Sequence, residues 1–264
     1  MLQQPPIYVL NLSRHTDRLE NMRVQIEKQG LNWERFPAID AKHTSETQLF
    51  EFTDPKGPIP KMGTGARACT SGHFKIWAHF LNTKAPVAFV LEDDATLSKE
   101  FSKFIIEAES YASQVDILNF NRQNSKGPNK KITVSRKNSL TGKIFSAQKL
   151  LAPHYGTAGY MITRSAASTL ITKVKRTNMP IDCLLFSPNI SRFSRDFKIY
   201  QSFPAFVEPN IQMFHTSIQD ERIPSSGSLQ NKIKRSYHEV NRIPLLLLHV
   251  LIKTAEIKIL KFLP

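Results

Sequence analysis

The sequence has little cysteine and no long hydrophobic run. Its two cysteines, Cys69 and Cys183, lie too far apart to form a zinc motif or a disulfide framework, so we expect both to be small core residues. No stretch approaches the roughly 20 apolar residues that a membrane-spanning helix requires. The first residues, MLQQPPIYVLNL, lack the basic and apolar regions of a secretory signal. These absences predict a cytoplasmic protein.

Acidic residues are scarce as well, and no internal repeat occurs. The 22 acidic residues are outnumbered by 36 lysines and arginines, which gives a net charge of +14. Such a balance attracts nucleic acid, anionic lipid or phosphorylated substrates, and charge alone does not choose among them. No recognisable nucleic-acid-binding motif is present, so nucleic acid is not the expected partner, although a basic nucleic-acid-binding protein stays an alternative.

Apolar segments of strand and helix type alternate along the chain. Residues 7–12 are almost continuously apolar, as in a strand buried on both faces, and Thr16 can cap the helical pattern that follows until Gly30 stops it. The spacing predicts further strands at residues 33–39, 86–91, 115–120, 160–162 and 198–207, and helices at residues 66–81, 101–105, 165–174 and 180–186. This alternation is typical of an α/β sheet. The basic, polar residues 121–143 predict an exposed loop or hairpin.

The composition changes after about residue 210. We therefore divide the chain into an α/β domain, residues 1–222, and a basic, partly amphipathic C-terminal segment, residues 223–264. If residues 230–264 are helical, one stripe of the helix is apolar: Leu245, Leu248, Ile252, Ile259 and Leu263. Basic residues beside an apolar stripe suit the cytoplasmic surface of a membrane. The alternative is a helix packed on the domain or on a second subunit of a homodimer.

Three adjacent acids end the apolar strand at residues 86–91. Glu92, Asp93 and Asp94 would repel one another and lose hydration if they were partly buried, and a divalent cation removes that problem. The carboxyl end of a strand is also where open α/β sheets bind ligands. The alternative is a solvated acidic turn that caps the next helix. A metal-dependent phosphoryl-transfer enzyme could use such a triplet too, although it more often gathers acids from several strands.

Two further segments have binding character. Asn11, Arg14 and Arg18 follow the first strand, and arginines there can hold a diphosphate through bidentate hydrogen bonds, unless they are ordinary surface charges at a helix start. Gly156 and Gly159 flank small residues, which permits close approach of the backbone to a ligand or to another strand, or forms a plain turn.

Motifs of these kinds follow one another along the chain: N-L-x-R-x-x-D-R at residues 11–18, A-x-D at 38–40, a degraded G-C-x-x-S-H at 68–73, L-E-D-D at 91–94, G-T-A-G-Y at 156–160 and P-I-D at 180–182. Their order and spacing resemble glycosyltransferase family 25, the lipooligosaccharide galactosyltransferases, over roughly residues 6–222. The sequence departs from that pattern at Ala68 and Gly72, where we expect altered helix packing rather than altered chemistry.

The resemblance implies a GT-A-type, Rossmann-like fold that binds a nucleotide-sugar. It further implies a UDP-sugar donor with galactose as the expected hexose, Mn²⁺ or Mg²⁺, and inversion at the anomeric carbon. The acceptor would be a lipooligosaccharide or lipopolysaccharide, presented at the inner membrane. An enzyme with such an acceptor would be cytoplasmic and peripheral to that membrane.

Candidate roles follow for particular residues. Asp94 is the expected main metal ligand, with Glu92 and His215 as further ligands. Asp182 is the first choice for the base that removes the acceptor's hydroxyl proton, and Asp116 is the second. The expected contacts to the donor come from four of the motifs: Asn11, Arg14, Arg18, Asp40, Glu92, Asp93, Gly156 and Thr157. Because side chains alternate along a strand, Glu92 and Asp94 should start on one side and Asp93 on the other.

Overall fold

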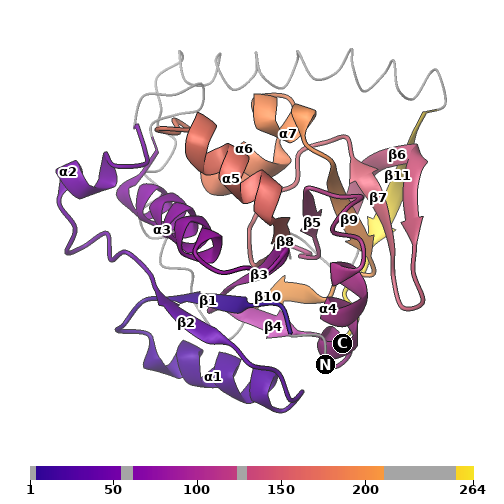
Figure 1. Cartoon of the computed structure of the whole chain (residues 1–264), viewed down its shortest axis with the longest axis horizontal. Helices are drawn as coiled ribbons and strands as arrows, with labels where there is room; N and C mark the ends of the chain where they lie inside the picture. The colour runs from indigo at the N-terminus through magenta and orange to yellow at the C-terminus, as the bar shows by residue number, and fades with distance from the viewer. Residues whose placement is uncertain (1–3, 55–61, 124–129, 211–253) are drawn as a thin grey trace.

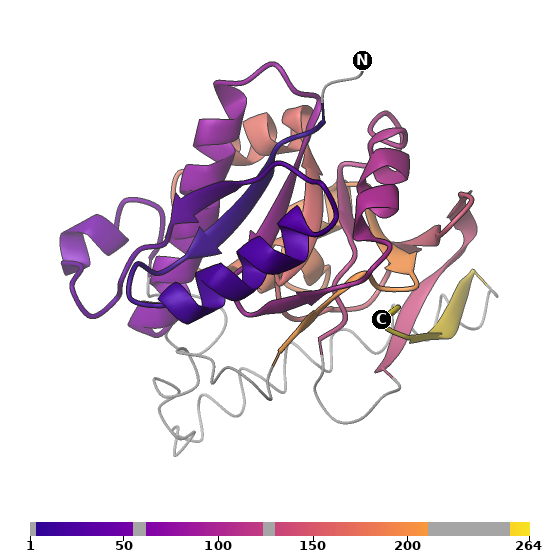
Figure 2. The same cartoon turned by 90° about the horizontal axis from the view of Figure 1, so that it is seen from below.

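The computed structural model describes residues 4–54, 62–123, 130–210 and 254–264. These residues form a mixed α/β fold around one nine-stranded sheet, with strand order β11-β6-β7-β9-β5-β8-β3-β1-β2, and a separate two-stranded pair, β10-β4. In Figures 1 and 2, α1 lies across one face of the sheet and α3 covers the other. No helix among the described residues is both long enough and apolar enough to cross a membrane.

The strands are β1 Ile7–Asn11, β2 Glu34–Pro37, β3 Val87–Glu92, β4 Ala95–Leu97, β5 Ile117–Asn119, β6 Lys130–Thr141, β7 Ser146–Leu150, β8 Gly159–Thr163, β9 Ile199–Phe203, β10 Val207–Pro209 and β11 Ala255–Leu260. The helices are α1 Thr16–Glu27, α2 Glu46–Leu49, α3 Thr64–Leu81, α4 Phe101–Glu109, α5 Arg164–Lys173, α6 Ile181–Phe186 and α7 Arg192–Asp196. The alternation expected from the sequence is therefore confirmed, and β6 with β7 makes a hairpin of the expected polar segment.

The central strands are buried on both faces. β1 is buried throughout, and its side chains alternate between two apolar clusters, with Tyr8 and Leu10 facing α3 and α5 and with Ile7 and Val9 facing α1 and α4. Strands β1, β2, β3, β5 and β9 run in one direction, because β8 is antiparallel to both β3 and β5. Their carboxyl ends thus meet at one edge of the sheet, which places polar residues from distant parts of the chain together.

Two expected helix caps are wrong. The cap of α1 is His15 rather than Thr16, and no side chain bonds to the free N–H groups there. The cap of α5 is Thr163, whose hydroxyl accepts from the backbone N–H of Ala166, rather than Ser165. In both cases the cap lies one or two residues before the hydroxyl residue that local sequence favours. Gly30, with φ of 70°, follows the end of α1 as expected.

The C-terminal residues are a strand where the sequence led us to expect a helix. Residues 255–260 pair antiparallel with β6 over six residues, from Ala255 opposite Ser135 to Leu260 opposite Lys130. The β-branched residues Ile257 and Ile259 favour strand, and the edge of β6 offers backbone groups that a helix would leave unpaired. Most of the tail, including Leu245, Leu248 and Ile252, lies outside the described residues.

This pairing predicts unequal effects of two substitutions in β11. Leu260 is fully buried in the cluster on the α3 side, whereas Ile257 is 64% exposed. We expect Leu260→Ala to lower the free energy of unfolding by about 2–5 kcal/mol and Ile257→Ala by less than about 1 kcal/mol. Urea denaturation of both variants measures the difference. Equal, small losses would mean that β11 does not pack on the sheet.

Candidate active site

The polar edge of the sheet is built from the ends of β1 and β3 and from the turn before β8. Leu10 pairs with Glu92, and Leu91 pairs with Gly159, so the three segments are held side by side by the sheet itself. The backbone N–H of Glu92 donates to the carbonyl of Ala158 at 3.1 Å, which fixes the turn against the acidic triplet. The motifs of the N-terminal, central and later parts of the chain therefore converge.

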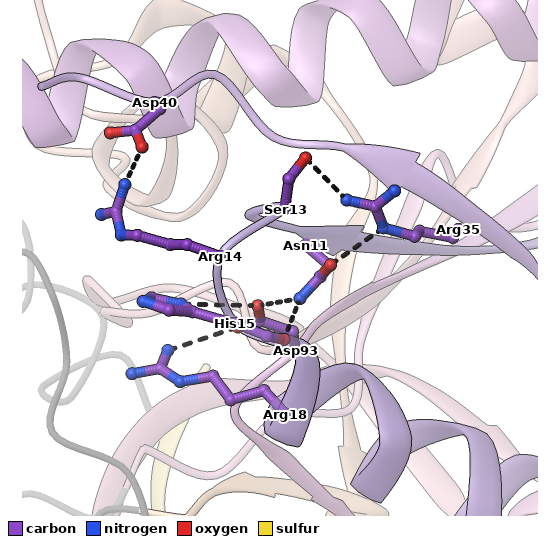
Figure 3. Close-up of polar contacts among 8 residues, drawn as sticks. All are labelled: Asn11, Ser13, Arg14, His15, Arg18, Arg35, Asp40 and Asp93. Carbon is purple, nitrogen blue, oxygen red and sulfur yellow. Dashed lines mark hydrogen bonds and ion pairs between the residues drawn. The ribbon is translucent and has the colours of Figure 1, made fainter. Parts of the chain in front are cut away.

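Asp93 is the centre of a hydrogen-bonded group that Figure 3 shows in close-up. Asn11 Nδ2 donates to Asp93 Oδ2 at 2.7 Å, and Arg18 Nη1 contacts Asp93 Oδ1 at 3.3 Å. The ring of His15 lies 4.0 Å from the same carboxylate. Burial raises the pKa of Asp93, against the opposing effect of Asn11 and Arg18, while burial and the charge of Arg18 lower the pKa of His15. The aspartate is thus fixed on the α1 side.

A second ring of contacts orients Asn11. Arg35 Nε donates to Asn11 Oδ1 at 2.9 Å, and its guanidinium also bonds the hydroxyl of Ser13 at 3.0 Å. The amide of Asn11 must therefore present its NH₂ group to Asp93. Nearer to solvent, Arg14 forms an ion pair with Asp40. The structure thus places Asn11, Arg14, Arg18, Asp40 and Asp93 in one neighbourhood, and each arginine there has a carboxylate beside it.

Glu92 points to the opposite side of the strand, toward α3. The hydroxyl of Thr157 donates to Glu92 Oε1, and His73 Nε2 lies 3.6 Å from the same oxygen. Although burial raises the pKa of Glu92, these contacts leave it below its ordinary value. His73 is fixed in turn by Tyr160, whose hydroxyl lies 2.8 Å from Nδ1. Trp77 Nε1 donates to that same hydroxyl at 2.9 Å, so the sheet and α3 together orient Glu92.

Asp94 is buried, and one of its oxygens has no partner. Oδ1 makes no hydrogen bond with any described residue, although the backbone carbonyl of Asp94 accepts from the N–H of Asn210 at 2.6 Å. Burial, followed by the charges of Glu92 and Asp93, raises the pKa of Asp94 to about 7. A cation beside this carboxylate would stabilise its ionised form. Its oxygen ligands fit a hard ion such as Mg²⁺ or Mn²⁺.

A second group of ligand atoms lies next to this carboxylate. Cys69, His73 and Glu92 offer atoms that are all within 4.8 Å of one another. Sulfur and nitrogen ligands suit zinc better than Mg²⁺ or Mn²⁺. Burial and the neighbouring acids raise the pKa of Cys69 well above its ordinary value, which disfavours the thiolate that a metal needs. The oxygen ligand at Asp94 is therefore the better fit for a hard ion, and His215 lies outside the described residues.

The two candidate bases lie at opposite edges of the sheet. Asp182, in the first turn of α6, accepts from the backbone N–H of Gly156 at 3.1 Å and from that of Cys183 at 2.8 Å. Burial raises its pKa. Asp116 precedes β5, so it lies at the amino ends of the parallel strands, where its carboxylate accepts from the N–H of Lys198 at 2.7 Å. Of the two, Asp182 belongs to the neighbourhood of Glu92 and Thr157.

The structure adds residues for which no role was predicted. His73 and Tyr160 belong to motifs, but nothing in their spacing indicates that they form a chain of contacts to Glu92. Arg122 follows β5 and pairs with Glu208, with Arg122 Nε 3.0 Å from the carboxylate. An arginine directly after a buried strand is the same signal that singled out Arg14 and Arg18, and it could have been noticed there.

Comparisons with known proteins define the class. The chain is 29% identical to the lipooligosaccharide biosynthesis protein lic2B of Haemophilus influenzae over 81% of this chain and 82% of that protein. It is 22% identical to the lacto-N-neotetraose biosynthesis glycosyltransferase LgtB of Neisseria meningitidis serogroup B, covering 70% and 69% of the two chains. It is 23% identical to procollagen galactosyltransferase 1 of Danio rerio, covering 77% of this chain and 36% of that one.

The names of these relatives agree with a glycosyltransferase, the first of the three functions left open above, and a family model decides among the three. The model of glycosyltransferase family 25, described as an LPS biosynthesis protein, matches residues 4–185, which is more than half of the chain. The protein belongs to glycosyltransferase family 25. The matched range includes every acidic residue of the edge described above, from Asp40 to Asp182.

The burial of Asp94 predicts a pH dependence of stability. Its pKa in the folded protein exceeds the unfolded value, so the folded state binds more protons between about pH 4 and pH 7, and the free energy of unfolding falls as the pH rises through that range. We expect Asp94→Asn to remove a few kcal/mol of this fall. Urea denaturation in EDTA at pH 4.5 and pH 7.5 measures it. The same fall in both proteins would contradict the burial of an ionisable Asp94.

Proposed function

We propose that this chain is a metal-dependent, inverting glycosyltransferase that moves a hexose, with galactose as first choice, from a UDP-sugar to a lipooligosaccharide or lipopolysaccharide. The observation that carries the proposal is the buried Asp94, whose Oδ1 has no partner among the described residues, at the carboxyl edge of a sheet in a family 25 protein. Burial and the charges of Glu92 and Asp93 raise the pKa of Asp94, so a cation beside its carboxylate would be favourable. A nucleotide diphosphate would supply the remaining ligands of such a cation.

The metal, Mn²⁺ or Mg²⁺, would be held by Asp94, with Glu92 and His215 as further ligands. When bound, it would supply positive charge beside the leaving diphosphate. Glu92 already accepts from Thr157 and lies beside His73, so its carboxylate is oriented before any ligand binds. A preoriented carboxylate loses little entropy on binding, which favours tight coordination.

The donor nucleotide would lie over the end of β1. Asp93 is fixed by Asn11 and Arg18, and a carboxylate in that position can accept from a ribose hydroxyl. Arg14 and Arg18 would neutralise the diphosphate, Arg14 by exchanging its contact with Asp40 for one with phosphate. Gly156, with φ of 86°, and Thr157 would bring the backbone of the turn close to the transferred sugar.

Asp182 would remove the proton from the acceptor hydroxyl. Two backbone N–H groups fix its carboxylate, while burial raises its pKa toward the range in which a carboxylate is an effective base at neutral pH. Inversion requires the acceptor to lie opposite the leaving diphosphate. Asp182 belongs to α6, whereas the proposed diphosphate contacts belong to α1 and to the loop before it, which is compatible with that arrangement.

The names of the relatives and the charge of the chain support the proposed acceptor and place of action. One relative is named for lipooligosaccharide biosynthesis and another as a galactosyltransferase. The net charge of +14 would hold the enzyme at the anionic cytoplasmic surface of the inner membrane as a peripheral protein. A homodimer formed through the C-terminal segment remains the alternative explanation of its apolar residues.

The metal proposal predicts the behaviour of one variant. Asp94→Ala should reduce kcat/KM at least roughly 100-fold and abolish the stabilisation of the protein by UDP with Mn²⁺, without lowering the melting temperature in EDTA. The control is Asp196→Ala, which removes an exposed acid on α7. Product formation from a UDP-sugar and thermal shift measure both effects. Full activity in EDTA, or in the Asp94 variant, would exclude the metal.

The proposal for the base predicts a contrast between two aspartates. Asp182→Asn should keep UDP affinity within about twofold and lose roughly 10²- to 10⁴-fold in kcat. Asp116→Asn is the matched comparison, because it makes the same change at the opposite edge of the sheet. Single-turnover rates and UDP titrations separate the two quantities. Loss of UDP affinity with unchanged kcat in Asp182→Asn would assign this residue to donor binding.

A further inference from the structure

Several buried polar atoms without partners lie beyond the residues used so far. Among the described residues, no hydrogen bond reaches Asn119 Nδ2, either amide atom of Asn121, Gln201 Oε1, Lys130 Nζ or the two ring nitrogens of His154. Asn119, Asn121, Gln201 and His154 are all fully buried. Each hydrogen-bond donor or acceptor left unpaired inside a protein costs about 1–3 kcal/mol of stability. A group of several such atoms therefore indicates a bound ligand or bound water.

The sheet brings the amides of this group together. Asn119 on β5 is paired with Gln201 on β9, and alternation places both on the same face as Ile117 and Ile199, which pack on the side of α3 and α5. Asn121 follows on the same face. Its Nδ2 is 3.3 Å from where a Cβ on Gly156 would lie, and the N–H of Gly156 donates to Asp182. The amides therefore extend from β9 toward the proposed base.

Lys130 lies on β6, on the same face of the sheet as these amides. It lies on the face of β6 that carries Ile132 and Val134, and it pairs with Leu260. The next residue after Leu260, Lys261, accepts through its carbonyl from the N–H of Ala205, just beyond the end of β9. Burial and the charge of Arg122 lower the pKa of Lys130 to about 8, while Asp182 acts in the opposite direction. Lys130 is thus electrostatically coupled to the proposed base.

The chemistry of this cluster suits one kind of ligand. Carboxamides both donate to and accept from sugar hydroxyls, and an ammonium group binds phosphate oxygens as a point charge. His154 stays neutral, because burial and the charge of Lys130 lower its pKa well below the ordinary value, so Lys130 is the cation available to an anionic group. Arg122, by contrast, is already engaged with Glu208.

We propose that Lys130, Asn121 and Gln201 line a subsite, beside Asp182, for a phosphate-bearing sugar. The inference rests on the proposed function, since it takes Asp182 as the base. The phosphate is one carried by the acceptor saccharide, because the diphosphate of the nucleotide-sugar is proposed to lie beside Arg14 and Arg18, on the side away from Asp182. The ammonium group of Lys130 binds the phosphate oxygens, and the two amides bind neighbouring sugar hydroxyls.

The test compares Lys130→Met with Lys131→Met, a change at the adjacent, exposed lysine that faces away from the cluster. Two measurements separate a phosphate on the acceptor from the diphosphate of the donor. Titration calorimetry with UDP and with uridine, in Mn²⁺, isolates contacts to the diphosphate. The KM for lipooligosaccharide before and after dephosphorylation with hydrofluoric acid isolates contacts to an acceptor phosphate. Lys130→Arg should restore most of whichever quantity is lost.

We expect Lys130→Met to raise the KM for intact, but not for dephosphorylated, lipooligosaccharide at least roughly tenfold and to leave the binding of UDP and of uridine unchanged. Weaker binding of UDP with an unchanged KM for lipooligosaccharide would instead place Lys130 at the donor diphosphate and overturn the acceptor subsite. If all four quantities stay within twofold of those of Lys131→Met, Lys130 is only a counter-ion of Asp182 and the subsite is wrong.

Two further outcomes are decisive. If neither Lys130→Met nor Lys130→Gln folds, as judged by circular dichroism, Lys130 is a structural residue and the subsite is again wrong. A wild-type protein that transfers no sugar from any UDP-sugar would instead overturn the proposed function. Wild-type transfer with no difference between the Lys130 and Lys131 variants overturns the subsite alone.

Discussion

The structure of this protein depends on the burial of three neighbouring carboxylates at the end of β3. An apolar strand delivers Glu92, Asp93 and Asp94 into the edge of the sheet, where each would be unstable without a partner. Asp93 is stabilised from α1 by Arg18 and from β1 by Asn11, and Glu92 from α3 and the turn before β8. Of the three, only Asp94 has a buried oxygen with no hydrogen-bond partner among the described residues. The proposed metal would offset the unfavourable burial of that unpaired oxygen.

The glycines of the surrounding motifs allow close packing at the same edge of the sheet. Gly159 begins β8, and a Cβ there would come within 2.5 Å of the ring of Phe120, so only glycine allows β8 to pair with β3 and β5 at this point. Gly72, where the sequence departs from the family pattern, packs against Leu10, and a Cβ there would meet that side chain at 3.0 Å. The departure therefore concerns the fit of α3 on β1, as expected, and leaves His73 beside Glu92.

Much of the fold could be predicted from sequence, because buried strands and amphipathic helices have characteristic periods. Strands β1, β3 and β8 and helices α3 and α6 lie where their apolar residues indicated. The tail could not be predicted, because the pairing of residues 255–260 depends on the free edge of β6, more than 100 residues earlier. Asn11, Arg18 and Asp93 were expected to lie together because each follows the end of a predicted strand. Asp116 precedes β5, so its place at the opposite end of the parallel strands became clear only once the direction of β5 was known. Nothing in the local sequence indicated a role for Lys130, because its proposed role depends on contacts with residues that are distant along the chain.

The central claim is that the acidic edge of the sheet serves transfer from a UDP-sugar. The most direct measurement is a comparison of product formation on lipooligosaccharide from a panel of UDP-, GDP- and CMP-sugars, each with Mn²⁺ and with EDTA. We expect metal-dependent transfer from UDP-sugars, fastest with UDP-galactose and ahead of UDP-glucose and UDP-N-acetylglucosamine. Preferred use of a GDP- or CMP-sugar, or equal transfer in EDTA, would contradict it.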